Sequence, residues 1–147
     1  MKIDDTNKAI INHLRNGRKP FKLIAQDLNI TINTVRARVS KLIDAGILDI
    51  VGLVDPEVFD GHSMAIIAIK MANMNLIKKG EELSKLKGVI SVSVVTGRYD
   101  IIITVLLKEK FGLLEFIAGE LANVKDIQST ETFVVYKSFN LKIPYLY

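Results

Sequence analysis

Residues 21–45, FKLIAQDLNITINTVRARVSKLIDA, predict two helices joined by a tight turn. In the second helix, apolar residues recur at steps of three, four and three, so they fall on one helical face and pack inward. These apolar residues are Ile32, Val35, Val39 and Leu42. The hydroxyl of Thr31 can cap the start of this helix, and Gly46 tolerates the left-handed backbone that ends helices. The pair of helices predicts a helix-turn-helix.

The opposite face of the second helix is polar and suits the major groove of DNA. Short side chains at the start of a helix can reach base edges, whereas long cations beside them reach phosphates. We therefore predict DNA contacts from Lys22, Thr31, Asn33, Thr34, Arg36, Ala37, Arg38 and Lys41. Among these, Asn33, Thr34 and Ala37 are expected at base edges and the cations mainly at phosphates. Two alternatives stay open: this face is ordinary solvated surface, or Arg38 pairs with an acidic neighbour and braces the motif.

Positive charge is concentrated around this motif. Residues 15–41 carry seven Lys and Arg side chains against one acidic residue, a local charge of +6, while the whole chain of 147 residues has a net charge of +4. Such a concentration is expected of a nucleic-acid binder. Nearly half of the chain is apolar, which suffices for one or two small domains.

The composition argues against several other classes of protein. There is no Cys, and His13 and His62 lie far apart, so we predict no disulfide, no metal site, no cofactor and no catalytic residues. The longest apolar run, residues 101–107, contains one Thr and is too short to cross a bilayer. No signal peptide opens the chain, which indicates a soluble cytoplasmic protein without membrane contact.

Other segments complete the first domain. Asp4 and Asp5 can cap a first helix that ends at Gly17, and Pro20 suits the first turn of the next helix. Residues 47–54, ILDIVGLV, are rich in aliphatic side chains and predict a short hairpin or wing.

The second half of the chain alternates between strand and helix patterns. Its predicted order of β, α, β, β, α, β is the ferredoxin-like arrangement. The strands are predicted at residues 63–71, 89–96, 101–107 and 127–136, and the helices at 76–87 and 111–121. The sequence thus predicts an α+β protein with a winged helix-turn-helix domain over residues 1–54 and a linker over 55–62. A ferredoxin-like domain over 63–147, with a C-terminal edge strand, completes the prediction.

One face of this predicted sheet needs a cover that its own helices do not provide. Both helices of a ferredoxin-like arrangement lie on one face, yet most positions of residues 65–69 and 101–107 are apolar on both faces. The same face of a second copy is the simplest cover, which predicts a two-fold homodimer. Its two recognition helices, about 34 Å apart, can read successive major grooves. The tail alternates like an edge strand that pairs within or between subunits, with apolar residues Phe139, Leu141, Ile143 and Tyr145.

The turn GRYD between two predicted strands is suited to binding an amino acid. Gly97 lets backbone amides approach a ligand carboxylate, Arg98 can pair with that carboxylate, and Asp100 can accept from an α-ammonium group. Thr130 and Thr132 share one face of the last strand and can add hydroxyls. The alternative is a plain hairpin turn with a contact between subunits.

Over nearly its whole length the chain resembles the leucine-responsive and asparagine regulator (Lrp/AsnC) family of prokaryotic transcription factors. The matching positions of the first domain are Ile3, Asp4, Ile10, Ile11, Arg18, Ile24, Ala25, Thr31, Val35, Arg38, Val39, Leu42, Gly46 and Ile47. Those of the linker and of the family's glycine-aromatic-aspartate turn are Asp55, Pro56, Gly61, Gly97, Tyr99 and Asp100. The chain departs from the family at Asn7, where Asp is usual, and at Pro20 and Thr31, where Ser is frequent.

The resemblance implies a homodimer that assembles into tetramers, octamers or larger rings and binds operator DNA under control of an amino acid or related metabolite. It places this effector in a cleft between dimers, near the turn Gly97 to Asp100 and the start of the last strand. With the threonines added, the candidate effector residues are Gly97, Arg98, Tyr99, Asp100, Thr130 and Thr132. Two alternatives belong to other classes of protein. One is an architectural DNA-binding protein without an effector. The other is an enzyme like the sirohaem decarboxylases, which would need His and Arg residues that the second domain hardly offers.

Overall fold

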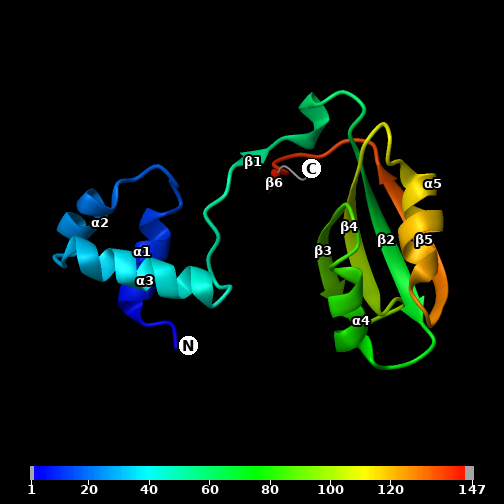
Figure 1. The fold of residues 1–147 in the computed structure, drawn as a ribbon, viewed down its shortest axis with the longest axis horizontal. Helices are drawn as coiled ribbons and strands as arrows, with labels where there is room; N and C mark the ends of the chain where they lie inside the picture. Colours follow the sequence, from blue (N-terminus) through cyan, green and yellow to red (C-terminus); the bar gives the residue numbers. More distant parts are fainter. Residues whose placement is uncertain (1, 145–147) are drawn as a thin grey trace. The chain divides into compact units, whose positions relative to one another are not determined.

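The computed structural model describes residues 2–144, and the chain divides after Gly52 into two compact units (Figure 1). Unit 1 is helical, and unit 2 is built on an antiparallel sheet. The predicted α+β class, with a helix-turn-helix followed by a ferredoxin-like domain, is confirmed. Within residues 2–144, no helix has the length and apolarity needed to cross a membrane.

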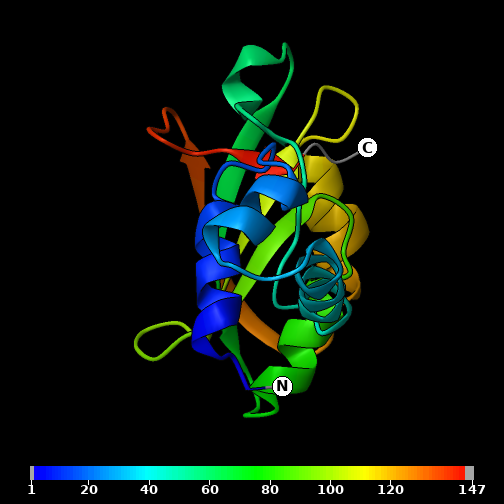
Figure 2. The same cartoon turned by 90° about the vertical axis from the view of Figure 1, so that its left-hand side faces the viewer.

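Unit 1 contains three helices, and the last two are the predicted helix-turn-helix. They are α1 (Asp5–His13), α2 (Phe21–Asp27) and α3 (Ile32–Asp44). Figure 2 shows α3 nearly end-on and α1 from the side. The Asp4 carboxylate accepts from the first turn of α1, and the Thr31 hydroxyl accepts from the Thr34 N–H, so both predicted caps are confirmed. The core of the unit is formed by Ile10, Leu14, Ile24, Ala25, Val35 and Val39.

The hairpin predicted for residues 47–54 is not formed. Residues 47–52 have no regular secondary structure, and β1 (Leu53–Val54) pairs with β6 (Ile143–Pro144) in unit 2. The aliphatic side chain of Val54 packs with Ile143, so it finds its apolar partner in the tail rather than in its own segment. The predicted edge strand of the tail therefore pairs within the chain. Tyr145, which belongs to that prediction, lies outside the described residues.

Unit 2 has the predicted order of strands and helices around a sheet of four antiparallel strands, β3-β4-β2-β5. The strands are β2 (Ser63–Met71), β3 (Val89–Val94), β4 (Ile101–Leu107) and β5 (Ile127–Val135). The first helix, α4 (Leu76–Leu83), is shorter than predicted and is followed by turns up to Gly88. The second, α5 (Leu113–Glu115), continues as a π turn, η2 (Phe116–Glu120), and a 3-10 turn, η3 (Leu121–Asn123). The predicted linker contains a 3-10 turn, η1 (Pro56–Val58).

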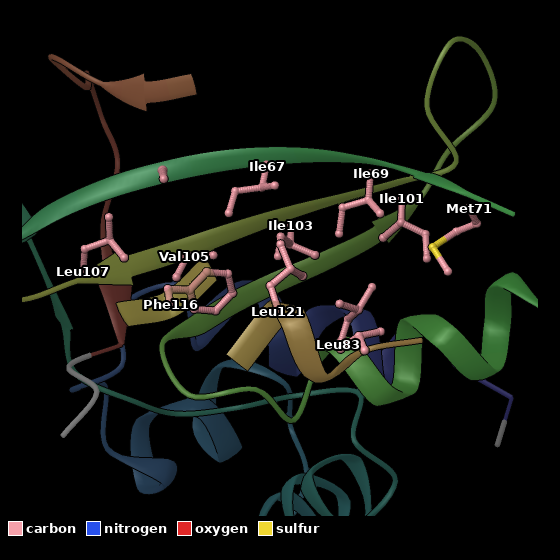
Figure 3. Close-up of a cluster of buried hydrophobic side chains, with 12 residues drawn as sticks. Ile67, Ile69, Met71, Leu83, Ile101, Ile103, Val105, Leu107, Phe116 and Leu121 are labelled. Carbon is pink, nitrogen blue, oxygen red and sulfur yellow. The ribbon is translucent and has the colours of Figure 1, made fainter. Parts of the chain in front are cut away.

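The core of unit 2 lies between one face of the sheet and these helices. Alternate side chains of β2 and β4 point toward Leu83 of α4 and toward Phe116 and Leu121 of the second helical segment (Figure 3). Because strand side chains alternate, Ile67 and Ile69 lie on this face while their neighbours lie on the other. These buried side chains pack the two helical segments against the sheet, so unit 2 has two layers.

The other face of the sheet is only partly covered. At one end, Met64 and Leu106 are buried against Ile143 of the tail. Further along, Ile66 and Phe133 lie opposite each other in register and remain 38% and 50% exposed. We call this surface of β2, β3, β4 and β5, away from the helices, the open face. It has the apolar character that the sequence predicts for a surface covered by another molecule.

Candidate functional site

The predicted DNA-contacting residues of α3 gather around a hollow of about 580 Å³. Its lining comes from α3 and from the start of α1 and comprises Lys2, Asp4, Asn7, Asn33, Thr34, Ala37, Arg38 and Lys41. Five of the predicted residues are therefore brought together. Lys22, Thr31 and Arg36 are exposed but do not line the hollow. Lys2, Asp4 and Asn7 were not predicted as neighbours of α3, because helical periodicity does not show which helices face each other.

Arg38 is directed toward the start of α1. Its Nη1 donates to Asp4 Oδ2 at 2.7 Å and to Asn7 Oδ1 at 2.9 Å, and its side chain is 31% exposed. The hydrogen bond from Arg38, with a second from the Asn7 N–H, lowers the pKa of the Asp4 carboxyl. The pairing with an acidic neighbour that the sequence left open for Arg38 is thus present.

Two further contacts organise the polar face of α3. Arg36 Nη1 donates to Asn33 Oδ1 at 3.3 Å, and the hydroxyls of Thr31 and Thr34 lie 2.9 Å apart. Since Thr31 also caps the helix, its hydroxyl is largely occupied by the backbone and side chain of Thr34. The amide of Asn33, the remaining hydrogen-bonding capacity of the Thr34 hydroxyl and the exposed methyl of Ala37 are then the short groups available on this face.

The GRYD turn is held by unit 2 itself. The Asp100 carboxylate accepts from Lys70 Nζ at 2.9 Å and from the Met71 N–H at 2.8 Å, and it is 13% exposed. The Met71 amide, followed by Lys70, lowers the pKa of Asp100. Asp100 thus fastens the turn to the end of β2, which favours the plain-turn interpretation for this residue. Gly97 has a φ of 136°, which suits glycine, and the Arg98 guanidinium lies 5.4 Å from the Tyr99 ring centroid.

The other predicted effector residues lie on the helix-covered side of β5. Thr130 and Thr132 pair with Ile69 and Ile67, so they share one face, and Thr130 lines an apolar hollow of about 290 Å³ beside Leu121. Glu131, between them, points to the open face and accepts from the Tyr99 hydroxyl. Within one chain, the threonines and Tyr99 are therefore separated by the sheet. Glu131 was not predicted as a partner of Tyr99, because this contact depends on how β5 is aligned with β2.

A helix-turn-helix with a cation-lined hollow, followed by a ferredoxin-like domain, defines a two-domain DNA-binding transcriptional regulator. Its family is the Lrp/AsnC regulators, to which the chain belongs. The model of the Lrp/AsnC ligand binding domain matches residues 64–142, and that of a winged helix-turn-helix DNA-binding domain matches residues 3–49.

Individual relatives agree along most of the chain. An uncharacterized HTH-type transcriptional regulator of Pyrococcus abyssi is 32% identical over 137 residues, covering 92% of this chain and 87% of that protein. The structure of E. coli AsnC superposes with a TM-score of 0.68 at 25% identity, covering 94% of this chain and 95% of that one. A Neisseria meningitidis regulator, solved with L-Met, has the same fold, with a TM-score of 0.70 at 20% identity and coverage of 95% and 94%.

Proposed function

We propose that this regulator recognises operator DNA with the exposed face of α3 and that its DNA binding changes when an amino acid binds to unit 2. The observation that carries the DNA site is the hollow in which Asn33, Thr34, Ala37 and Lys41 meet. In this proposal Asn33, Thr34 and Ala37 lie at base edges, while Lys22, Arg36 and Lys41 contact phosphates. Both units have a binding role and no catalytic one.

Fluorescence anisotropy tests the DNA site. The probes are a duplex from upstream of the gene that encodes this chain and a scrambled duplex of equal length, titrated over a series of salt concentrations. We expect the upstream duplex to bind more tightly, and both affinities to fall steeply as salt rises because phosphate contacts release counterions. Equal affinity for the two duplexes would favour the architectural alternative.

The proposed ligand class is an α-amino acid. The family match to a ligand-binding domain supports a ligand in unit 2, and the N. meningitidis neighbour was solved with L-Met. Because Asp100 is engaged with Lys70 and Met71, Arg98 is the predicted turn residue best suited to pair with a ligand carboxylate. The separation of Tyr99 from Thr130 favours a site that a second copy completes.

The ligand proposal is tested by adding a pool of the twenty amino acids to the upstream-duplex titration. We expect the pool to change the apparent affinity, and subdividing it to identify the active compound. Arg98→Ala should abolish this response while leaving the affinity without ligand unchanged. A response that survives in Arg98→Ala would exclude Arg98 as the carboxylate contact.

A homodimer formed through the open face is the third part of the proposal. The exposed Ile66 and Phe133 on this face support this arrangement, since the chain's own tail covers only part of the face. Such a dimer presents two copies of α3 to one DNA duplex, and further assembly to tetramers or octamers is compatible with it.

A further inference from the structure

Asn7 is a buried polar residue at the edge of the proposed DNA site. The residue is 6% exposed, and the other buried side chains among residues 2–144 are apolar. Buried polar groups are retained where hydrogen bonds satisfy them. The Asn7 N–H donates to Asp4 Oδ1 at 2.7 Å, and its Oδ1 accepts from Arg38. Since Arg38 also donates to Asp4, the three residues form a closed ring.

This ring joins a part of α1 that apolar packing does not hold. Within residues 2–52, the first side chain of α1 that belongs to the apolar core is Ile10. The first turn of α1 therefore adds no side chain to this core. On α3, the buried side chains are Val35, Val39 and Leu42, which lie on one face. Such a line of contacts resists separation of the helices better than it resists rotation of α3 about its own axis. Arg38 lies on the flank of α3, where a fixed contact limits this rotation.

We propose that Asp4 and Asn7 are positioning residues for DNA recognition, which fix the rotation of α3 through Arg38. A base-edge hydrogen bond tolerates only small displacements, so a rotated α3 would misplace Asn33 and Thr34 while leaving flexible cations able to reach phosphates. This inference rests on the proposed DNA-binding face of α3. It predicts that the ring governs sequence preference rather than general affinity for DNA.

The same contacts change the expected role of Arg38. Its charge is matched by the Asp4 carboxylate at 2.7 Å, whereas for Lys41, in the same hollow, no carboxylate of residues 2–144 lies within 4 Å. Lys41 is therefore the phosphate contact of this hollow, and Arg38 holds the helix. The two cations lie three residues apart on α3, so they form a matched pair for substitution.

The test compares Asn7→Ala, Arg38→Gln and Lys41→Gln with the wild-type full chain. Anisotropy is measured on the upstream and scrambled duplexes over a salt series, at a temperature where far-UV circular dichroism shows every variant folded. Asn7→Ala removes one of the two acceptors of Arg38 and opens the ring without changing any charge. We expect Asn7→Ala and Arg38→Gln to lower the upstream-to-scrambled affinity ratio about tenfold, with the salt slope unchanged. Lys41→Gln should lower the slope by about 0.9 per phosphate contact.

Several results would overturn the inference. A salt slope that falls in Arg38→Gln as it does in Lys41→Gln would make Arg38 a phosphate contact. An unchanged affinity ratio in folded Asn7→Ala and Arg38→Gln would leave the ring with a stabilising role alone. If Arg38→Gln does not fold, Arg38→Lys replaces it, because lysine keeps the charge but lacks the planar guanidinium. An unchanged affinity ratio in Arg38→Lys would also contradict the inference. A wild-type chain without sequence preference would instead overturn the proposed function itself, independently of any variant.

Discussion

Asp100 shows at the scale of one residue how a plausible ligand contact turns out to be a structural one. In the sequence its carboxylate follows Gly97 in a turn and can accept from a bound amine. In the structure, Lys70 and the Met71 N–H already donate to it. We therefore predict that Asp100→Asn lowers the melting temperature of unit 2 by several degrees without abolishing a response to amino acids. Loss of the response in a folded, equally stable variant would return Asp100 to the ligand site.

The same carboxylate makes the stability of unit 2 depend on pH. Its donors lower the pKa of folded Asp100 below the ordinary value of about 3.9 that applies to the unfolded chain. The contribution is therefore complete above the unfolded pKa and is lost as pH falls through the folded pKa. Melting curves of the wild type and Asp100→Asn should differ most at pH 6 and converge below about pH 4. A difference that stays constant from pH 3 to pH 7 would assign the effect to packing.

At the scale of elements, periodicity predicted the burial of Val35, Val39 and Leu42 on α3, but Ile32, which was also expected to pack inward, is 37% exposed at the first turn of the helix. Contacts between elements depended on register. Thr130 and Thr132 were expected on one face and are found there, because alternation along a strand is local. That this face carries the helices, and that Glu131 meets Tyr99, follows from the pairing of β5 with β2. In the same way, the capping of α3 by Thr31 was predictable, whereas the contact of Arg38 with Asp4 spans 34 residues. The absent hairpin at residues 47–54 has the same cause, since its partner strand comes from the tail.

The segment from α5 through η2 offers a test of what holds the second helical layer to the sheet. Phe116 begins the π turn, is fully buried and meets the ring of Phe111 edge-on at 6.3 Å. We expect Phe116→Ala to lower the free energy of unfolding of unit 2 by about 3–5 kcal/mol, because it removes an aromatic side chain and leaves a cavity. Leu114, in the same segment but 73% exposed, is the control, and Leu114→Ala should change that energy by less than about 0.5 kcal/mol. Equal losses measured by urea unfolding would show that the segment is held in another way.

At the scale of the whole molecule, the open face carries both apolar and charged residues, and a second copy of the chain could cover it. Its apolar part includes Ile66 and Phe133, which lie opposite each other on β2 and β5. The charges of Lys70 and Glu131 on this face have partners within the same chain, in Asp100 and Tyr99. A second copy that covers this face would leave Lys70 ion-paired with Asp100 and Glu131 hydrogen-bonded to Tyr99, and both contacts lower the cost of burying a charge.

Ile66→Lys tests this homodimer directly. Ile66 is 38% exposed in unit 2, so a lysine there can keep its charge in water in a monomer, but a dimer through the open face would bury that charge without a partner. We expect sedimentation equilibrium at micromolar concentration to show a dimer or a larger assembly for the wild type and a shift toward monomer for Ile66→Lys. Ile77→Lys is the matched control, because Ile77 is 69% exposed on α4, on the helix-covered side. A wild-type monomer would refute the dimer, and dissociation by Ile77→Lys alone would place its interface on the helical side. If Ile66→Lys alone dissociates the assembly, the open face is what joins two copies of α3 into one DNA-binding unit.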